Sequence, residues 1–273
     1  MFFQLRQTIS KFLSVTGGIN YFWNRLPNGV YVFNYHRIGD KEKTPFDRAI
    51  FSCTQKAFEQ QIIELKNHFT IINTVELSRM IEHDEIVDGR FALITFDDGY
   101  LDNFTEALPI LKKHQVTAVF YLTTDLLEPC RVTWWDEIAY LLRKSHGMVY
   151  QLPNGILEYK LEKGNIDKII QRIMSDIKQT KNLSVLTALK DIRSKFPAAR
   201  TELLAEDYEL FMSWEHAKEL LTNGMEIGSH TLTHPILAQL NMEQQKLEIS
   251  ESKTMLEERL HCTINSIAYP VGR

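Results

Sequence analysis

Cysteine, glycine and proline are all scarce in this sequence. Its three cysteines, Cys53, Cys130 and Cys262, are far apart, odd in number and without a C-x-x-C pair, which argues against a disulfide framework and a zinc knuckle. We therefore expect buried, reduced thiols and a cytoplasmic location. With 12 glycines and 8 prolines in 273 residues, the chain is neither collagen-like nor a low-complexity linker.

Long apolar runs and an excess of one charge are also missing. No uninterrupted apolar stretch reaches the length of about 18 residues that a transmembrane helix requires. The 31 lysines and arginines nearly balance the 35 aspartates and glutamates, so the formal net charge is −4. Nucleic-acid binding needs a clustered basic excess, and we expect no nucleic-acid partner. The 44% of hydrophobic residues is typical of a globular protein of one or two domains.

The first 29 residues are expected to form an amphipathic helical segment. Apolar residues recur there at helical spacing, among them Leu5, Ile9 and Phe12, and polar or basic residues interrupt the run. Three alternatives remain open: a helix that packs on the domain, a cationic helix of residues 1–25 on the inner face of a membrane, or a cleaved signal.

From residue 30 onward, short strand-like runs alternate with helical patterns. This alternation predicts a parallel α/β architecture, and the nearly all-apolar run at 91–96 suits a strand buried on both faces. Glycine after one helical pattern and Ser213 or Asn241 before others give helix boundaries. The six expected strands are residues 30–38, 70–75, 91–96, 117–123, 225–229 and 266–269.

Residues of about 125–207 interrupt the alternation, and we interpret them as an insertion in a domain that spans residues 30–273. Strand-like flanks surround Pro153-Asn154-Gly155, which indicates a hairpin, and two amphipathic helices follow. Trp134 and Trp135 open this insertion; they fit either a sugar-stacking platform or the packing of an inserted helix. Trp214 is expected in the core.

Adjacent carboxylates stand at the end of the 91–96 strand, in Thr95-Phe96-Asp97-Asp98-Gly99-Tyr100. The carboxyl ends of parallel strands form the functional face of such folds. Neighbours on an extended chain point in opposite directions, so a turn is needed for both carboxylates to face one site. Ordinary turn chemistry of Asp-Gly remains the alternative.

Two histidines follow the 225–229 strand, in Ser229-His230-Thr231-Leu232-Thr233-His234-Pro235. Pro235 disfavours a helix at His234, so a strand-end loop is expected. Two imidazoles and one carboxylate make a three-ligand site with open positions, the pattern of a catalytic zinc. A third strand end, Ile267-Ala268-Tyr269-Pro270-Val271-Gly272, carries no chemistry by itself.

In this order, T-F-D-D-G-Y, H-T-x-x-H and A-Y-P-x-G resemble the first three motifs of the polysaccharide deacetylases, the NodB-homology group of carbohydrate esterases, over residues 30–272 apart from the insertion. The resemblance implies an α/β fold: a distorted (β/α) barrel of the glycoside hydrolase and deacetylase type, complete or incomplete. It implies that Asp98, His230 and His234 bind a divalent metal, commonly zinc, and that Asp97 is the general base. It also places the Val271 backbone N–H at the oxyanion.

The sequence departs from the family pattern at two positions. The general acid is usually a histidine in a later motif, and the chain given ends at Arg273. Either the chain is cut short, or His36 in Asn34-Tyr35-His36-Arg37-Ile38 is the acid, as in permuted members with a Y-H motif; a structural histidine is the other interpretation. Ala268 replaces the usual arginine that holds the base, so either the orientation of Asp97 comes from elsewhere, with Arg37 as one candidate, or activity is weaker.

The resemblance therefore implies a metal-dependent hydrolase that removes N-acetyl or similar N-acyl groups from amino sugars of a glycan. We also expect Tyr269 and Trp135 at the substrate. The alternatives are a deacylase of a lipid-linked sugar or another small amide, and a catalytically weak glycan-binding homologue. The sugar, its linkage and the metal in the cell are not determined by the sequence.

Overall fold

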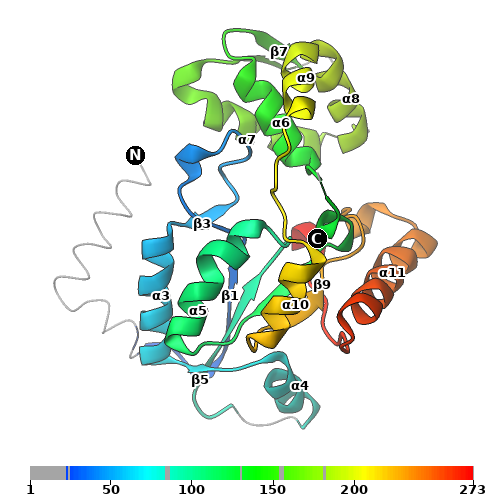
Figure 1. Ribbon diagram of the computed structural model, residues 1–273. Helices are drawn as coiled ribbons and strands as arrows, with labels where there is room; N and C mark the ends of the chain where they lie inside the picture. Colours follow the sequence, from blue (N-terminus) through cyan, green and yellow to red (C-terminus); the bar gives the residue numbers. More distant parts are fainter. Residues whose placement is uncertain are drawn as a thin grey trace, which may run out of the picture.

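The computed structural model describes residues 23, 25–83, 87–129, 131–153, 157–180 and 183–272 (Figure 1). Most of the predicted N-terminal helical segment (residues 1–22 and 24), Cys130 and most of the turn at Pro153-Asn154-Gly155 lie outside these residues. Cys53 and Cys262 are free, partly buried thiols. None of the described helices is long and apolar enough to cross a membrane.

A parallel sheet of five strands forms the centre of the described chain, in the order β1-β5-β6-β9, with β4 paired to the beginning of β5. β5 is buried over nearly its whole length, so the nearly all-apolar run from Phe91 onward is packed on both faces of the sheet. The mixed α/β architecture with a parallel sheet is thus confirmed. The strands are β1 (Gly29–Tyr35), β4 (Thr70–Ile71), β5 (Arg90–Phe96), β6 (Val119–Leu122) and β9 (Glu226–Ser229).

Helices pack around this sheet and enclose the main hydrophobic core. In Figure 1, α3, α5 and α10 lie along one side of the sheet, and α11 packs beside β9. Trp214 is 7% exposed within that core, as expected. The bounds are α3 (Gln55–His68), α4 (Thr74–Glu82), α5 (Leu108–His114), α10 (Trp214–Thr222) and α11 (Met242–Leu260). Short turns of helix are η1 (Lys41–Lys43), η2 (Asn103–Ala107), η3 (Thr124–Leu127), η4 (Lys163–Asn165), η5 (Leu237–Gln239) and η6 (Pro270–Gly272).

The strand pairings of the described residues leave the sheet open, so they do not confirm a closed barrel. β1 forms one edge. At the other edge, the strand expected at residues 266–269 is reduced to a single bridge between Ile267 and Ser229. No backbone pairing among the described residues joins this bridge to β1.

Two expected strands are shorter than the sequence suggests, each for a local reason. The strand at residues 30–38 is broken at His36 into β1 and β2 (Arg37–Ile38), and β2 pairs with β3 (Phe51–Cys53) instead of continuing along β5. The strand at residues 70–75 ends early because Asn73 forms a capping box with Glu76 and starts α4.

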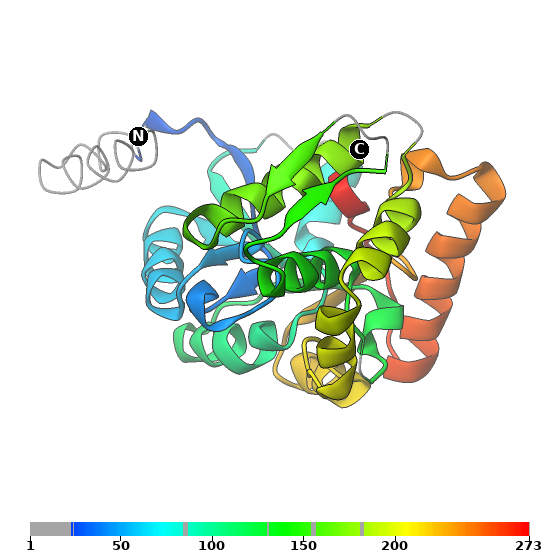
Figure 2. The same ribbon diagram turned by 90° about the horizontal axis from the view of Figure 1, so that it is seen from above.

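The segment interpreted as an insertion forms the lobe at the top of Figure 1, which lies over the sheet in the view from above (Figure 2). Its predicted hairpin is present, since β7 and β8 pair antiparallel. Its hydrophobic core includes Phe46 and Tyr100 from outside the lobe, so the two parts pack together. The lobe consists of α6 (Trp134–Lys144), β7 (Val149–Gln151), β8 (Glu158–Lys160), α7 (Ile166–Gln179), α8 (Val185–Lys195) and α9 (Pro197–Ala205).

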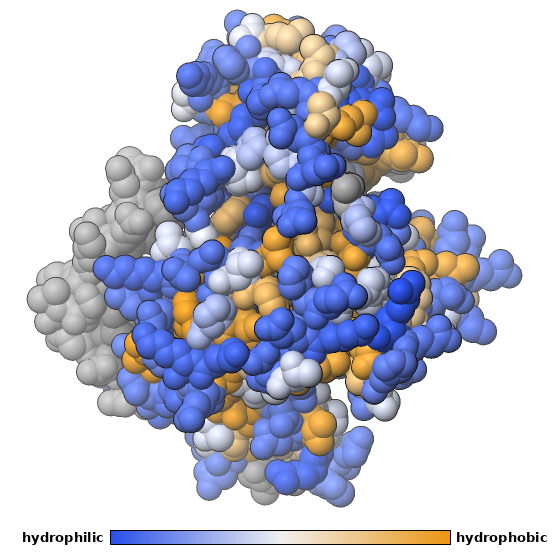
Figure 3. Space-filling model, in the orientation of Figure 1, coloured by the Kyte–Doolittle hydropathy of each residue, from blue (hydrophilic) through white to orange (hydrophobic). Residues whose placement is uncertain are grey.

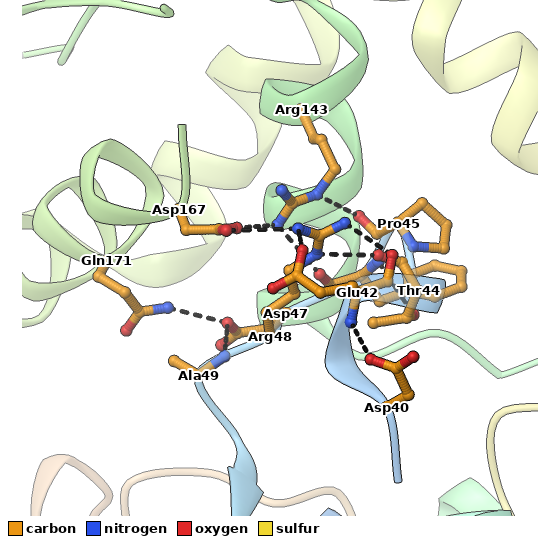
Figure 4. A network of polar contacts seen from close by, with 11 residues as sticks. Asp40, Glu42, Thr44, Pro45, Asp47, Arg48, Ala49, Arg143, Asp167 and Gln171 are labelled. Atoms are coloured by element: carbon orange, nitrogen blue, oxygen red, sulfur yellow. Dashed lines mark hydrogen bonds and ion pairs between the residues drawn. The ribbon is translucent and has the colours of Figure 1, made fainter. Parts of the chain in front are cut away.

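A polar network joins this lobe to the loop that follows β2 (Figure 4). Asp167 on α7 pairs with both Arg48, at 3.4 Å, and Arg143, at 2.6 Å. Gln171 donates a 2.8 Å hydrogen bond to Oδ1 of Asp47. These polar contacts hold the lobe in place above the carboxyl ends of the strands.

Hydrophilic residues cover most of the surface in Figure 3, across the lobe and the sheet domain alike.

Candidate active site

A tight turn after β5 brings the two adjacent carboxylates to the same side. The Asp97 N–H still continues the β1–β5 ladder by donating to the Tyr35 carbonyl. Asp98 and Gly99 then adopt φ angles of 74° and 90°, in the left-handed region that Asp tolerates and Gly favours. Both carboxylates line one cavity as a result.

The loop after β9 carries the two histidines and is also held in an unusual conformation. Thr231 and His234 have φ angles of 69° and 60°. The Thr231 hydroxyl accepts a 3.1 Å hydrogen bond from the His234 N–H, which closes the loop on itself. Pro235 follows outside any helix, as expected.

Asp98, His230 and His234 meet in a cluster whose ligand atoms lie within 4.8 Å of one another. The Nε2 atoms of His230 and His234 are 3.4 and 3.2 Å from Oδ1 of Asp98. Nδ1 of His230 is 2.9 Å from the Ala268 carbonyl, which can only accept; Nδ1 therefore carries a proton, and Nε2 is the ring atom that faces the cluster. Oδ1 of Asp98 is buried and makes no hydrogen bond.

These three side chains fit a divalent metal. A carboxylate and two imidazole nitrogens that face one another in a buried site need a positive charge to hold them together, which a proton supplies without metal and a divalent ion would supply in its place. Burial alone would raise the pKa of Asp98, but the two imidazoles hold it well below its usual range. Burial would lower the pKa of His230, yet Asp98 raises it. A carbonyl-oriented imidazole, a second imidazole and a carboxylate form the nitrogen and oxygen donor set of a catalytic zinc site.

Asp97 lies outside this cluster and has partners of its own. Its Oδ2 accepts a 2.7 Å hydrogen bond from the Asn34 side-chain amide, and Oδ1 of Asn34 accepts from the Thr95 hydroxyl at 3.0 Å. The expectation that Arg37 orients Asp97 is wrong. Arg37 is bound instead to Asp102 at 2.7 Å and lines a different cavity.

His36 lies beside Asp97, with Nε2 at 4.0 Å from Oδ2. It occupies the break between β1 and β2, where its backbone N–H bonds Ser52 and its carbonyl accepts from Asn103. Its side chain is 38% exposed and lines the cavity. On the single strand expected at residues 30–38, residues 34 and 36 would share a face, so the period of two is the signal that could place Asn34 beside His36 at the cavity.

The remaining predicted site residues line the same cavity, whose volume is about 750 Å³. Tyr269 and Val271 form its rim and are 59% and 40% exposed. Trp135 is 7% exposed, its ring lies 4.7 Å from that of His234, and its indole N–H donates to the Tyr100 hydroxyl. Trp135 is therefore packed, as one of the two alternatives from the sequence expects, and it also borders the cavity.

The wall opposite the cluster comes from the lobe. One face of α7 contributes Gln171, Ser175, Lys178 and Gln179, and the Lys178 ammonium lies 5.3 Å from the Trp134 ring centre. The cavity thus combines a metal-competent cluster, a separate carboxylate with a nearby imidazole, and a wall of hydrogen-bonding and aromatic groups. This arrangement can hold a polar ligand while one group accepts a proton and another donates one.

The sequence matches a protein-family model and known proteins, and these matches agree with the motifs that line this cavity. The polysaccharide deacetylase family model matches residues 84–149 and 171–273. YxkH of Bacillus subtilis strain 168, which carries the name of a polysaccharide deacetylase, is 24% identical over 247 residues; these are 90% of this chain and 58% of that relative's length.

Two solved structures share the fold. The Streptococcus pyogenes deacetylase PplD, solved in complex with acetate, is 20% identical with a TM-score of 0.54, over 91% of this chain and 76% of its own. IcaB from Ammonifex degensii is 16% identical with a TM-score of 0.50, over 89% and 75%. The match of the family model to more than half of the sequence is decisive: the chain belongs to the polysaccharide deacetylase family.

Proposed function

We propose that this protein is a metal-dependent hydrolase that removes N-acetyl groups from amino sugars of a glycan. One observation carries the proposal: Asp97 is held by Asn34, apart from the Asp98, His230 and His234 cluster, in the same cavity. A carboxylate that served only as a further metal ligand would not be hydrogen-bonded to a residue outside the cluster. Asp97 therefore remains available as a base.

The residues divide the reaction between them. Asp98, His230 and His234 would hold a divalent metal, which we expect to be zinc; when bound, it supplies Lewis-acid activation of water and of the amide carbonyl. Asp97 accepts the proton of the attacking water. His36, 4.0 Å from Asp97, donates a proton to the departing amine. The Val271 N–H is assigned to the developing oxyanion, as in the family resemblance.

The cavity wall supports a sugar substrate. Carbohydrates combine a dense set of hydroxyl groups with apolar ring faces, and the wall offers amide, hydroxyl and ammonium groups from α7 beside Trp134 and Trp135. We also propose that the sheet curves into an incomplete barrel with its open seam at this cavity. In support, Asn34 and His36 from one sheet edge and Tyr269 and Val271 from the other line the same space.

Acetate release from three kinds of substrate tests this function. The zinc-loaded full chain is incubated with N-acetylglucosamine oligomers, a lipid-linked N-acetylated sugar and an N-acetylated amino acid. We expect release from the oligomers in preference to the other two. Preference for the lipid-linked sugar or the amino acid would replace the glycan assignment, and binding of oligomers without any release would identify a glycan-binding homologue.

A further inference from the structure

The histidine loop is held in a conformation that its own sequence does not favour. A threonine is β-branched and rarely adopts positive φ, yet Thr231 has a φ of 69° and is fully buried. His234, three residues later, has a φ of 60°. Strained positions of this kind persist only where the surroundings fix them. The structure must therefore contain groups outside the loop that fix it.

Glu248 of α11 is such a group. It is 8% exposed, and Oε2 accepts hydrogen bonds from the backbone N–H groups of both Leu232 and Thr233 at 2.9 Å. Oε1 accepts a third from the Thr233 hydroxyl at 2.6 Å. Hydrogen bonds to a buried carboxylate are stronger than those to a neutral acceptor. Three of them converge on the two residues that separate Thr231 from His234.

A second contact from α11 holds the beginning of the loop. The hydroxyl of Ser252, one helical turn beyond Glu248, is hydrogen-bonded to the hydroxyl of Ser229, which also accepts from the Thr231 N–H. α11 packs beside β9 along this stretch (Figure 1). α11 therefore holds the loop at two places: Ser252 at its beginning, and Glu248 at the two residues before His234.

We propose that Glu248 is a positioning residue for the metal site: it holds the loop so that His230 and His234 both reach Asp98, without contacting the metal itself. This inference rests on the proposed metal site but not on the identity of the substrate. Outer groups that fix the orientation of metal ligands typically contribute about 10–100-fold to metal affinity.

Zinc affinity, measured by calorimetric titration of the chelator-stripped full chain, tests the proposal. We expect Glu248→Ala to weaken zinc binding by about 10-fold or more. Glu248→Gln should retain most of the affinity, because its amide oxygen can still accept both backbone N–H groups. Thr233→Val removes one of the three bonds at an exposed residue, so it should fold normally and weaken binding by a smaller factor.

Glu257 is the matched control on the same helix. Its Oε1 accepts a 2.9 Å hydrogen bond from the Ile264 N–H, so it also holds a loop, but one without a histidine of the cluster. Glu257→Ala should lower thermal stability and leave zinc affinity unchanged. Unchanged zinc affinity in Glu248→Ala and Thr233→Val, or an equal loss of zinc affinity in Glu257→Ala, would overturn the role of Glu248 but not the metal site. Failure of the wild-type chain to bind zinc would overturn the metal site and with it this role of Glu248.

Discussion

The side-chain amide of Asn34 donates a 2.7 Å hydrogen bond to Oδ2 of Asp97, across the pairing of β1 with β5. Thr95, the register partner of Asn34, donates to Oδ1 of Asn34 and thereby fixes which way the amide faces. The chain Thr95–Asn34–Asp97 orients the proposed base. It accounts for the orientation of Asp97 although position 268 is an alanine.

Replacing Asn34 should therefore impair catalysis without impairing metal binding. In Asn34→Ala we expect kcat to fall by about 10-fold or more, with zinc affinity and KM close to those of the wild type, because only the orientation of Asp97 is lost. Thr95→Val should show a smaller decrease, since it frees Asn34 but keeps the amide. Steady-state acetate release and zinc titration measure both effects; an unchanged kcat in Asn34→Ala would refute this role.

The two adjacent aspartates should separate in function. Asp97→Asn is expected to keep zinc affinity and lose hydrolysis by about 100-fold or more, since the amide cannot accept the proton. Asp98→Asn should lose both, because a ligand is removed. If zinc titration finds the same loss in the two variants, the division between base and ligand is wrong.

His36 should control the alkaline side of the pH profile. A general acid must be protonated to act, so kcat is expected to fall on the alkaline side of the pH profile. His36→Gln should lower kcat by about 100-fold and abolish this alkaline limb. A limb that persists in the variant would show that another group donates the proton.

The predictable part of the site is what local sequence determines. Asp98 and His230 stand just after the ends of two parallel strands, His234 lies in the loop that follows the second, and the ends of parallel strands meet at one edge, so the cluster follows from the order of the motifs. The parallel α/β architecture follows from the alternation of strand and helix patterns in the same way. Neither inference needs a side-chain contact.

The unpredictable part depends on contacts between distant segments. Asn34 and Asp97 are 63 residues apart, and nothing in either neighbourhood indicates their bond. Arg37 seemed available as a partner for Asp97, but the break at His36 directs it to Asp102. The strand at residues 70–75 was overestimated because its β-branched residues Thr74 and Val75 belong to a helix that Asn73 caps.

Asp47, beneath the lobe, should make stability depend on pH. Burial raises its pKa from 3.8 to about 6, with Asp136 adding to the rise, so the folded state binds this proton more tightly than the unfolded chain. The stabilisation of the folded state by the protonated Asp47 is complete below pH 3.8 and is lost as the pH rises to about 6. Above that pH, the ionised group costs on the order of 2–3 kcal/mol.

Asp47→Asn should remove this cost, since an amide oxygen can still accept from Ala49 and Gln171. We expect the variant to be more stable than the wild type at pH 8 and to lose that advantage near pH 4. Urea unfolding at the two pH values measures the difference. An advantage of equal size at both pH values, or one that grows toward acid, would contradict the assignment to Asp47.

Acetate release from an N-acetylglucosamine oligomer, followed while zinc is added to the chelator-stripped full chain, tests the proposed function most directly. We predict no release without metal, a rise that saturates at one zinc per chain, and no rise at any zinc concentration in a variant that lacks His230 and His234. Release that is independent of metal, or that survives the loss of both histidines, would contradict the proposal that this cluster and Asp97 form a metal-dependent deacetylase site.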